Sequence, residues 1–322
     1  MFDWKSEQRP IVALAPMADM TDSAFCRIAK RLGCRIVFRE MVSAEAIVRA
    51  SDKTLQMAAF DEEERPIIQQ LFGADPQVMS AAARLIDERY SPDGFDINMG
   101  CPACKIVSTF NGASLLRNPK LAADIVRSVK ASTKKPVSAK MRLGWSEPDE
   151  ILEFVKYIED AGADLITIHG RTKKQGYAGQ ANWEMIGRAK QLVSIPVLAN
   201  GDINSPTAAI QAMRITGCDG MLIARGSLGN PWLFKEIAEA LQNSDRMIAT
   251  NDIAVQDLPE VKRVVRDHAQ LHAELYGGER PLVTFRKHLV YYFRGFFGAK
   301  NLREKLVQVE TLEDLNTVLS EL

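Results

Sequence analysis

Two cysteines lie three residues apart in the segment 96–105, which reads DINMGCPACK. Cys101 ends an apolar run and precedes a proline, and Cys104 completes a CxxC pair. Such a pair can be a redox dithiol, half of a metal site, or one reactive thiol beside a chance second cysteine. A dithiol needs the thioredoxin topology around it, and a zinc site needs further ligands. The sequence has no HExxH and no second CxxC, so we expect no metal and a lone reactive thiol at Cys101.

Other side chains able to do chemistry follow short apolar, β-branched runs along the chain. They are Gln70, Asn98, Lys140, Arg142, His169, Arg171, Asn200, Asp202 and Arg225. One polar residue after such a run is an ordinary loop residue, but here six of eight runs end this way. The last two runs lead into ANGDI (199–203) and IARGSLGNP (223–231), whose glycines leave backbone N–H groups open for a phosphate. We therefore expect one polar site, with Arg225 as the cation at its phosphate end.

The elements that position these side chains are eight expected strands, each followed by a helix-like stretch. The strands are expected over residues 11–17, 35–41, 66–73, 94–100, 136–144, 164–170, 195–201 and 219–226. This repeat is typical of parallel β-loop-α units, and eight of them favour a (β/α)8 TIM barrel. A doubly wound sheet is disfavoured because no GxGxxG follows any strand. In a barrel the carboxyl ends of all strands meet at one mouth, so the polar side chains should converge there.

Composition and charge exclude several classes of protein. The chain has 322 residues with 41 Lys and Arg against 41 Asp and Glu, and 46% of its residues are hydrophobic. No apolar run approaches the roughly 18 to 20 residues of a membrane span, and the first residues do not read as a secretion signal. An odd number of cysteines, five, argues for reduced thiols rather than a disulfide framework. We expect a cytoplasmic protein with no membrane partner.

The strand pattern ends near residue 245, and the rest of the chain has helical periodicity. We expect a barrel domain over 1–244 and a separate domain of three or four helices over 245–322. Between Lys262 and Lys305 there are ten Lys and Arg and four Asp and Glu, so 10 − 4 leaves an excess of six positive charges. Such an excess is typical of a surface that binds a polyanion. In FRKHLVYYFRG (285–295), Arg286, Lys287 and Arg294 are candidates for phosphate contacts.

Nine segments together resemble the tRNA-dihydrouridine synthases, flavoenzymes that reduce uridines in tRNA, and most closely their bacterial B-type branch. The segments are APMADMTD (15–22), QLFG (70–73), DINMGCP (96–102), NGASLLRNP (111–119), KMRLGW (140–145), HGRT (169–172), ANGDI (199–203), GNPW (229–232) and FRKHLVYYFRG (285–295). They occur in order over almost the whole chain. The resemblance implies a TIM-barrel enzyme with FMN as cofactor, NADPH or NADH as reductant and tRNA as substrate, which we expect to act as a monomer.

The resemblance also implies roles for single residues. FMN contacts are implied for Pro16, Met17, Ala18, Gln70, Lys140, His169, Asn200, Gly201, Asp202, Ala224, Arg225 and Gly226. Cys101 corresponds to the catalytic acid of the family, and we expect Asn98, Arg142 and Arg171 at the substrate. Cys104 stands where the family commonly has another residue, and we expect it to have no role.

Two positions depart from the family pattern. Asp19 and Ala224 stand where glycine is usual. If Ala224 adopted a positive φ, the strain would cost roughly 1 kcal/mol, which would affect the phosphate loop. An aspartate in a turn is better tolerated, because its short side chain can bond locally.

The residues suit the reduction of a polarised C=C bond independently of the resemblance. A hydride that arrives at C6 of uracil leaves negative charge over C5 and O4, and an acid must then protonate C5. A thiol with an ordinary pKa near 8.5 keeps its proton at neutral pH and can supply it, whereas an ordinary carboxylic acid has lost its proton. Lys140 can stabilise the charge of a reduced flavin.

Two other functions remain open from the sequence. One is an FMN barrel acting on a free pyrimidine, like the dihydroorotate dehydrogenases, although a small substrate does not need the helical tail. The other is an RNA-binding protein that has kept the barrel without catalysis. The sequence does not indicate which tRNA position is reduced.

Overall fold

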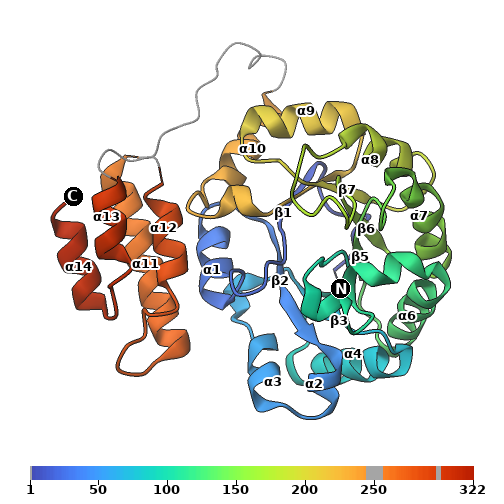
Figure 1. Cartoon of the computed structure of the whole chain (residues 1–322), viewed down its shortest axis with the longest axis horizontal. Coiled ribbons are helices and arrows are strands. Elements are labelled where there is room, and N and C mark those ends of the chain that lie inside the picture. The colour runs from blue at the N-terminus through green and yellow to red at the C-terminus, as the bar shows by residue number, and fades with distance from the viewer. Residues whose placement is uncertain (1, 244–256, 295–298) are drawn as a thin grey trace.

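The computed structural model describes residues 2–243, 257–294 and 299–322, apart from the side chains of 104, 105, 299 and 300. Within these ranges, eight parallel strands pair in sequence order and close into a barrel (Figure 1). The strands are β1 (Ile11–Leu14), β2 (Ile36–Ser43), β3 (Ile67–Phe72), β4 (Gly94–Met99), β5 (Val137–Arg142), β6 (Leu165–His169), β7 (Val197–Asn200) and β8 (Gly220–Ile223). Each strand overlaps its predicted range, so the prediction of a TIM barrel is confirmed.

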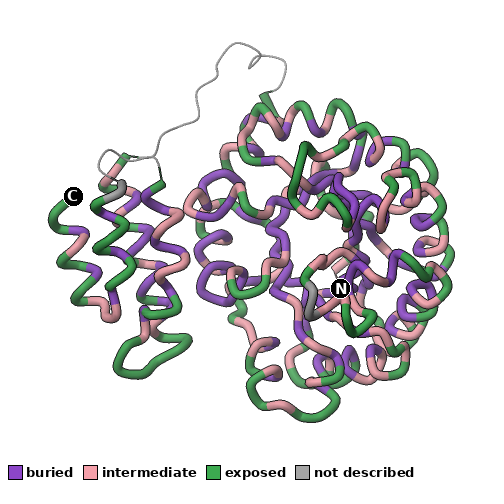
Figure 2. Tube along the Cα trace, in the orientation of Figure 1, coloured by how far each residue is buried: buried purple, intermediate pink, exposed green. Residues whose placement is uncertain are grey.

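The strands read as continuous apolar runs because both of their faces are buried. Along β2, Ile36 and Phe38 belong to a cluster with Leu165, Leu198 and other inward residues of the barrel. Val37, between them, packs in the larger cluster formed with the surrounding helices. Figure 2 shows this as buried strands inside a ring of helices whose outer surfaces are exposed. Burial on both faces is the usual state of parallel strands, and it explains why the strands could be found from the sequence.

Helices connect the strands and form the outer layer of the barrel. They are α1 (Ser23–Arg31), α2 (Ala44–Val48), α3 (Asp52–Ala58), α4 (Pro76–Tyr90), α5 (Cys104–Val107), α6 (Pro119–Ser132), α7 (Ile151–Asp160), α8 (Trp183–Lys190), α9 (Pro206–Thr216) and α10 (Leu233–Gln242), with short 3-10 turns η1 (Glu62–Glu64), η2 (Gly112–Arg117), η3 (Pro148–Glu150) and η4 (Arg225–Ser227). Asp75, Asn118 and Ser205 each accept an N–H of the first turn and precede a proline in that turn. These caps fix where α4, α6 and α9 begin.

The tail forms helices that stand beside the barrel, next to α1 (Figure 1). They are α11 (Leu258–Tyr276), α12 (Arg286–Tyr292), α13 (Ala299–Leu306) and α14 (Leu312–Ser320). Their apolar cluster also contains Ala24 and Ile28 of α1, together with Trp232. The expected boundary at 244 and 245 lies outside the described residues. None of the helices that the structure describes combines the length and the apolar character that a membrane span requires.

The whole positive excess predicted for the tail is balanced by acidic residues outside the counted window. Residues 257–322 contain ten Lys and Arg and ten Asp and Glu, so 10 − 10 leaves no net charge. Ion pairs join Arg263 to Glu260 and Asp267, Arg280 and Arg286 to Glu310, and Lys305 to Glu321. The predicted polyanion-binding surface therefore has only single unpaired cations to offer. Examples are Lys287 and Arg294, whose side chains have no ion pair within the described ranges.

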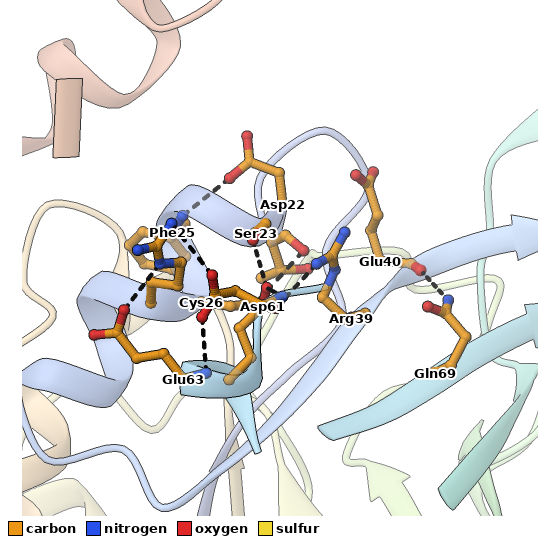
Figure 3. A network of polar contacts seen from close by, with 12 residues as sticks. Asp22, Ser23, Phe25, Cys26, Arg39, Glu40, Asp61, Glu63 and Gln69 are labelled. Carbon is orange, nitrogen blue, oxygen red and sulfur yellow. Dashed lines mark hydrogen bonds and ion pairs between the residues drawn. The ribbon is translucent and has the colours of Figure 1, made fainter. Parts of the chain in front are cut away.

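A buried ion pair joins β2 to η1, and a hydrogen bond to the same carboxylate connects α1 (Figure 3). Arg39 donates to Glu64 at 2.9 Å and to the carbonyl of Met57 at 2.9 Å. The Glu64 carboxylate also accepts the Ser23 hydroxyl and the N–H of Asp61. Both charged side chains are almost fully shielded from solvent, at 3% and 0% exposure. A pair this deeply buried is strongly destabilising when only one partner is removed.

We expect Arg39→Met to destabilise the protein by about 3–5 kcal/mol, because Glu64 would keep a buried charge without its cation. The matched control is Arg49→Met, since Arg49 makes an exposed i,i+4 pair with Glu45 and should change stability by less than about 1 kcal/mol. Urea unfolding followed by circular dichroism measures both. Equal losses in the two variants would contradict the assignment.

Candidate active site

The carboxyl ends of the strands surround two adjoining cavities of about 520 Å³ and 360 Å³. The two cavities share the lining residues Pro16, Met17, Lys140, His169, Tyr177, Arg225, Leu228 and Tyr291. They therefore form one cleft, with the first cavity over the loops after β7 and β8 and the second over the end of β4. One wall of this cleft comes from the tail, because Tyr291 lies on α12.

The cleft brings most of the predicted site residues together. The first cavity is lined by Pro16, Met17, Lys140, His169, Asn200, Gly201, Asp202, Ala224, Arg225, Gly226 and Arg294. The second is lined by Pro16, Met17, Ala18, Gln70, Asn98, Cys101, Lys140, Arg142 and His169. Of the predicted residues, Arg171, Arg286 and Lys287 line neither cavity in the described part of the chain. The side chain of Cys104 lies outside the described residues.

Gly226 brings the loop after β8 against the loop after β7, and Gly201 brings the loop after β7 against the end of β6. A Cβ on Gly226 would lie 2.7 Å from the carbonyl oxygen of Ile203, in the neighbouring loop. A Cβ on Gly201, whose φ is +110°, would lie 2.8 Å from the ring of His169. The positions need glycine, because any side chain would collide with backbone or with a catalytic-site ring. The result is a glycine-containing cradle at the edge of the first cavity, which Gly201 and Gly226 both line.

Arg225 is the accessible cation of this cradle. Its side chain is 56% exposed and lies 4.0 Å from the carboxylate of Asp202. Its guanidinium also lies over the ring of Tyr177, with 4.5 Å to the ring centre. A planar fork of donors held against an aromatic face is well suited to an oxyanion. Sequence reasoning missed Tyr177, since an aromatic residue in a glycine-rich loop carries no specific signal.

The two positions that depart from the family pattern are accommodated. Ala224 has a φ of −110°, so the strain that a positive φ would impose on alanine does not arise. Asp19 does adopt a positive φ, +61°, and its N–H is bonded to the carboxylate of Glu40 at 2.9 Å. Aspartate is among the residues that tolerate this conformation.

Lys140 and His169 face the junction of the two cavities and differ in charge. Burial lowers the pKa of Lys140 to about 8, although Asp96 opposes the shift, so the amine is mainly protonated at neutral pH. It has no hydrogen-bond or ion-pair partner among the residues that the structure describes. Burial and the nearby cations lower the pKa of His169 to about 2, which keeps its ring neutral. Nε2 of His169 lies 3.4 Å from Arg171, which can only donate, so this nitrogen is the acceptor.

Asn98 positions the loop that carries the reactive thiol. Its side-chain oxygen accepts the N–H of Cys101 at 3.0 Å and the N–H of Gly100 at 3.2 Å. Its amide nitrogen donates to the side-chain oxygen of Gln70 at 2.8 Å. Asn98 thus makes bonds within the protein and also borders the second cavity, and its bond to a substrate carbonyl stays a prediction. The half-buried thiol of Cys101 borders the second cavity, which also contains Lys140.

The series of hydrogen bonds that runs from Cys101 through Asn98 and Gln70 ends at Asp96. This residue was not singled out from the sequence. It accepts the amide of Gln70 and the hydroxyl of Ser138, each at 2.6 Å. Strand register explains both contacts, because Asp96 is paired with Gln70 on β3 and with Ser138 on β5. Burial raises its pKa to about 6, while the two hydrogen bonds and Lys140 favour the carboxylate. The available signal was an acid in the middle of a buried apolar strand.

Two predicted substrate residues hold the loop 170–179. Arg142 donates to the carbonyls of Gly100, Thr172 and Gly176. Arg171 donates to the carbonyls of Ala178 and Gly179 and to the carboxylate of Asp202. Both side chains are buried. All donor groups of Arg171 are engaged, whereas none of the described hydrogen bonds of Arg142 uses Nη2, and Arg142 borders the second cavity, so its role at the substrate stays a prediction. Asp202 is likewise neutralised by Arg171, which leaves its backbone at the cavity.

The three predicted cations of the tail differ in their surroundings. Arg286 is bonded through Nε and Nη2 to the carbonyls of Val309 and Gln308 and to Glu310, so it stabilises the tail, and its phosphate contact stays a prediction. Lys287 is half-buried and away from the cleft. Arg294 is exposed and borders the first cavity. Arg294 is therefore the tail cation best placed to act at the site.

Known structures share the barrel fold with this chain. A 2-naphthoyl-CoA reductase complex superposes with a TM-score of 0.57 at 14% identity, covering 72% of this chain and 50% of that one. Histamine dehydrogenase from Rhizobium sp. 4-9 superposes with a TM-score of 0.56 at 12% identity, covering 81% of this chain and 49% of that one. The chain thus spans about half the length of these two structures, and the likeness concerns the fold alone.

Sequence relatives cover nearly the whole chain. The "Probable tRNA-dihydrouridine synthase 1" of Synechocystis sp. is 39% identical over 96% of this chain and 85% of its own length. The "tRNA-dihydrouridine synthase B" of Pseudomonas putida is 38% identical over 92% of this chain and 86% of its own length. The family model described as "Dihydrouridine synthase (Dus)" matches residues 13–321. The chain belongs to the dihydrouridine synthase family.

Proposed function

We propose that this chain reduces uridines of tRNA to dihydrouridine, with FMN as its cofactor and NADPH or NADH as reductant. The observation that carries the proposal is the cleft itself. In it, the thiol of Cys101 and the unpaired amine of Lys140 border one cavity, which opens onto a glycine cradle beside Arg225. We further infer that the protein acts as a monomer in the cytoplasm, where it meets tRNA.

The chain's own residues fit a flavin mononucleotide in the cleft. The cradle of Gly201 and Gly226, with the exposed guanidinium of Arg225, suits the phosphate. Lys140, which has no partner among the described side chains, suits the edge of the ring system, where a cation favours negative charge. Pro16, Met17 and Ala18 supply a mostly apolar wall beside it. When bound, the flavin supplies the hydride that reaches C6 of the uracil ring.

Cys101 then supplies the proton. Arrival of a hydride at C6 leaves negative charge over C5 and O4, and the Sγ–H of Cys101 donates its proton to C5. The bonds from Asn98 to the backbone of Gly100 and Cys101 hold the thiol's loop in place during this step. The charge of Lys140 lowers the free energy of the anionic state, because it acts in a cavity that excludes most water.

Asp96 fixes the direction of the hydrogen bonds that reach this loop. A side-chain amide can turn over and exchange its donor and acceptor ends, but a carboxylate only accepts. Asp96 therefore forces the amide nitrogen of Gln70 toward itself and leaves the oxygen of Gln70 for Asn98. Asn98 must then offer its own oxygen to the N–H of Cys101.

Recognition of tRNA requires that the target base leave its stack and enter the cleft. Extrusion of a base costs a few kcal/mol, least in a loosely stacked loop. Arg294, at the cavity rim, would contact the RNA backbone near the entrance, and Lys287 on α12 would contact it farther from the cleft. The tail would thus determine which base reaches Cys101, reading shape more than sequence.

The proposal is tested with tRNA that lacks dihydrouridine. With NADPH and this tRNA, the wild-type protein should form dihydrouridine. Cys101→Ala should keep its yellow colour and its reduction by NADPH, but lose turnover by roughly 100-fold or more, because the acid is gone. Cys104→Ala is the matched control and should retain turnover. Activity on free uridine or dihydroorotate without activity on tRNA would contradict the proposal, as would a colourless wild-type protein.

We expect Asp96→Asn to lower kcat roughly 10- to 100-fold, because the amides of Gln70 and Asn98 would lose their fixed orientation. Wild-type kcat should fall as the pH decreases through about 6, where Asp96 gains a proton and becomes a donor. Asp96→Asn should lack this limb of the pH profile. Ser138→Ala removes a bond that favours the carboxylate, so its limb should move to higher pH. If the acidic limb of the kcat–pH profile did not shift in Ser138→Ala, the group that titrates would be one other than Asp96.

We expect Lys287→Ala and Arg294→Ala to weaken tRNA binding and make its salt dependence shallower. Each lost phosphate contact should reduce the slope of log K against log salt by about 0.7 to 0.9. Arg127→Ala is the control, because Arg127 is an exposed arginine on α6, across the barrel from the tail (Figure 1). Filter binding at several salt concentrations measures the slopes. Unchanged slopes in both variants would remove these cations from the RNA surface.

A further inference from the structure

Three of the four histidines of the chain converge on one carboxylate between barrel and tail. His268 and His272 lie one turn apart on α11, and His288 lies on α12. Asp22, at the N-terminus of α1, uses one oxygen to accept the N–H of Phe25 at 3.0 Å. The other oxygen of Asp22 points away from α1 (Figure 3) and accepts the hydroxyl of Tyr276 at 3.1 Å. All four side chains are buried, and none borders the catalytic cleft in the described residues.

The potential ligand atoms of this cluster lie close together. Asp22, His268 and His288 each offer one such atom, and these atoms lie within 4.8 Å of one another. Nδ1 of His272 lies 3.5 Å from the carboxylate of Asp22. Ligand atoms at 2.0–2.1 Å from a zinc ion are about 3.4 Å apart, so small side-chain rotations would close the set around one ion.

The hydrogen bonds of the histidines follow the pattern of metal ligands. Nδ1 of His268 lies 3.0 Å from the hydroxyl of Tyr292, and Nε2 of His272 lies 2.8 Å from the hydroxyl of Thr284. The opposite nitrogen of each ring, and both nitrogens of His288, are buried without a hydrogen-bond partner in the described structure. A histidine that binds a metal commonly uses its second ring nitrogen in this way, for an outer partner that orients the ring.

A single divalent cation would satisfy one unpaired nitrogen on each of the three histidine rings, and only the second nitrogen of His288 would stay without a partner among the described residues. A buried polar atom without a partner costs about 1–3 kcal/mol. Imidazole nitrogens with one carboxylate form a donor set that suits zinc and its first-row neighbours. We propose that Asp22, His268, His272 and His288 bind one such ion, with zinc as the best match, and that this ion joins the tail to the barrel.

The ligands come from two parts of the fold, which gives the ion a structural role. Asp22 belongs to the barrel, and the histidines belong to α11 and α12. Metal binding would therefore favour the docked arrangement of the tail, because the complete donor set exists only there. Since Tyr291 and Arg294 border the cleft, a fixed tail also fixes that rim of the site.

The test measures metal in the untagged full chain. We expect about one zinc ion per chain after purification without chelator, and an absorption spectrum typical of tetrahedral cobalt after exchange with Co²⁺. Removal of the metal with a chelator should lower the melting temperature, and Zn²⁺ should restore it. A protein that is metal-free as purified and takes up neither ion would overturn the proposal, and a buried water would then be the partner of these nitrogens.

Variants distinguish this site from other binders of zinc. His288→Gln should lose the ion and the response of the melting temperature to Zn²⁺. Tyr292→Phe is the matched control, because it removes only the outer partner of His268 and should weaken binding by about 10- to 100-fold without abolishing it. Cys101→Ala should retain the ion. Loss of the ion in Cys101→Ala but not in His288→Gln would place it at the cysteines and overturn the proposal.

Discussion

Closure of the parallel sheet is the constraint on which the rest of the structure depends. When eight strands run in the same direction around a barrel, all their carboxyl ends lie at one mouth. The apolar residues inside and outside the strands are buried by this closure, so their burial stabilises the same arrangement that gathers the polar ends. Gln70, Cys101, Lys140 and Arg225 come from different strand ends and reach one cleft for that reason alone.

Within the mouth, hydrogen bonding orders groups that have no fixed direction of their own. Two amides, Gln70 and Asn98, would each be stable in either orientation, and a buried carboxylate at Asp96 decides between them. The cost of burying that carboxylate is offset by its two short hydrogen bonds and by the cation of Lys140. This arrangement links the charge of Asp96 to the backbone of the loop that carries Cys101. The same hydrogen bonds therefore affect both the stability of the barrel and the position of the thiol.

The tail packs against the barrel and forms part of the cleft wall. Its apolar cluster includes Ala24 and Ile28 of α1, and Tyr291 forms part of the cleft wall. The domain boundary expected from the sequence separates two kinds of secondary structure, but the contact between them is an apolar interface that also buries Asp22. A substrate as large as tRNA would contact both parts, and their fixed arrangement would then determine how deeply a base can enter.

The sequence by itself determined the barrel, because burial on both faces makes each strand readable as an apolar run, and it named Cys101 and Lys140, which do line the cleft. Their roles in the reaction remain predictions. Only the tertiary structure decided which polar side chains still have donors or acceptors available for a ligand. The donors of Arg171 are engaged by carbonyls of the loop it precedes and by Asp202, whereas Arg142 contacts the same loop and still borders the second cavity. Asp22 acquires its partners from α11, where Tyr276 is 254 residues distant in the chain. A local pattern records burial and turn chemistry, but hydrogen bonds between distant segments depend on how the chain closes in space.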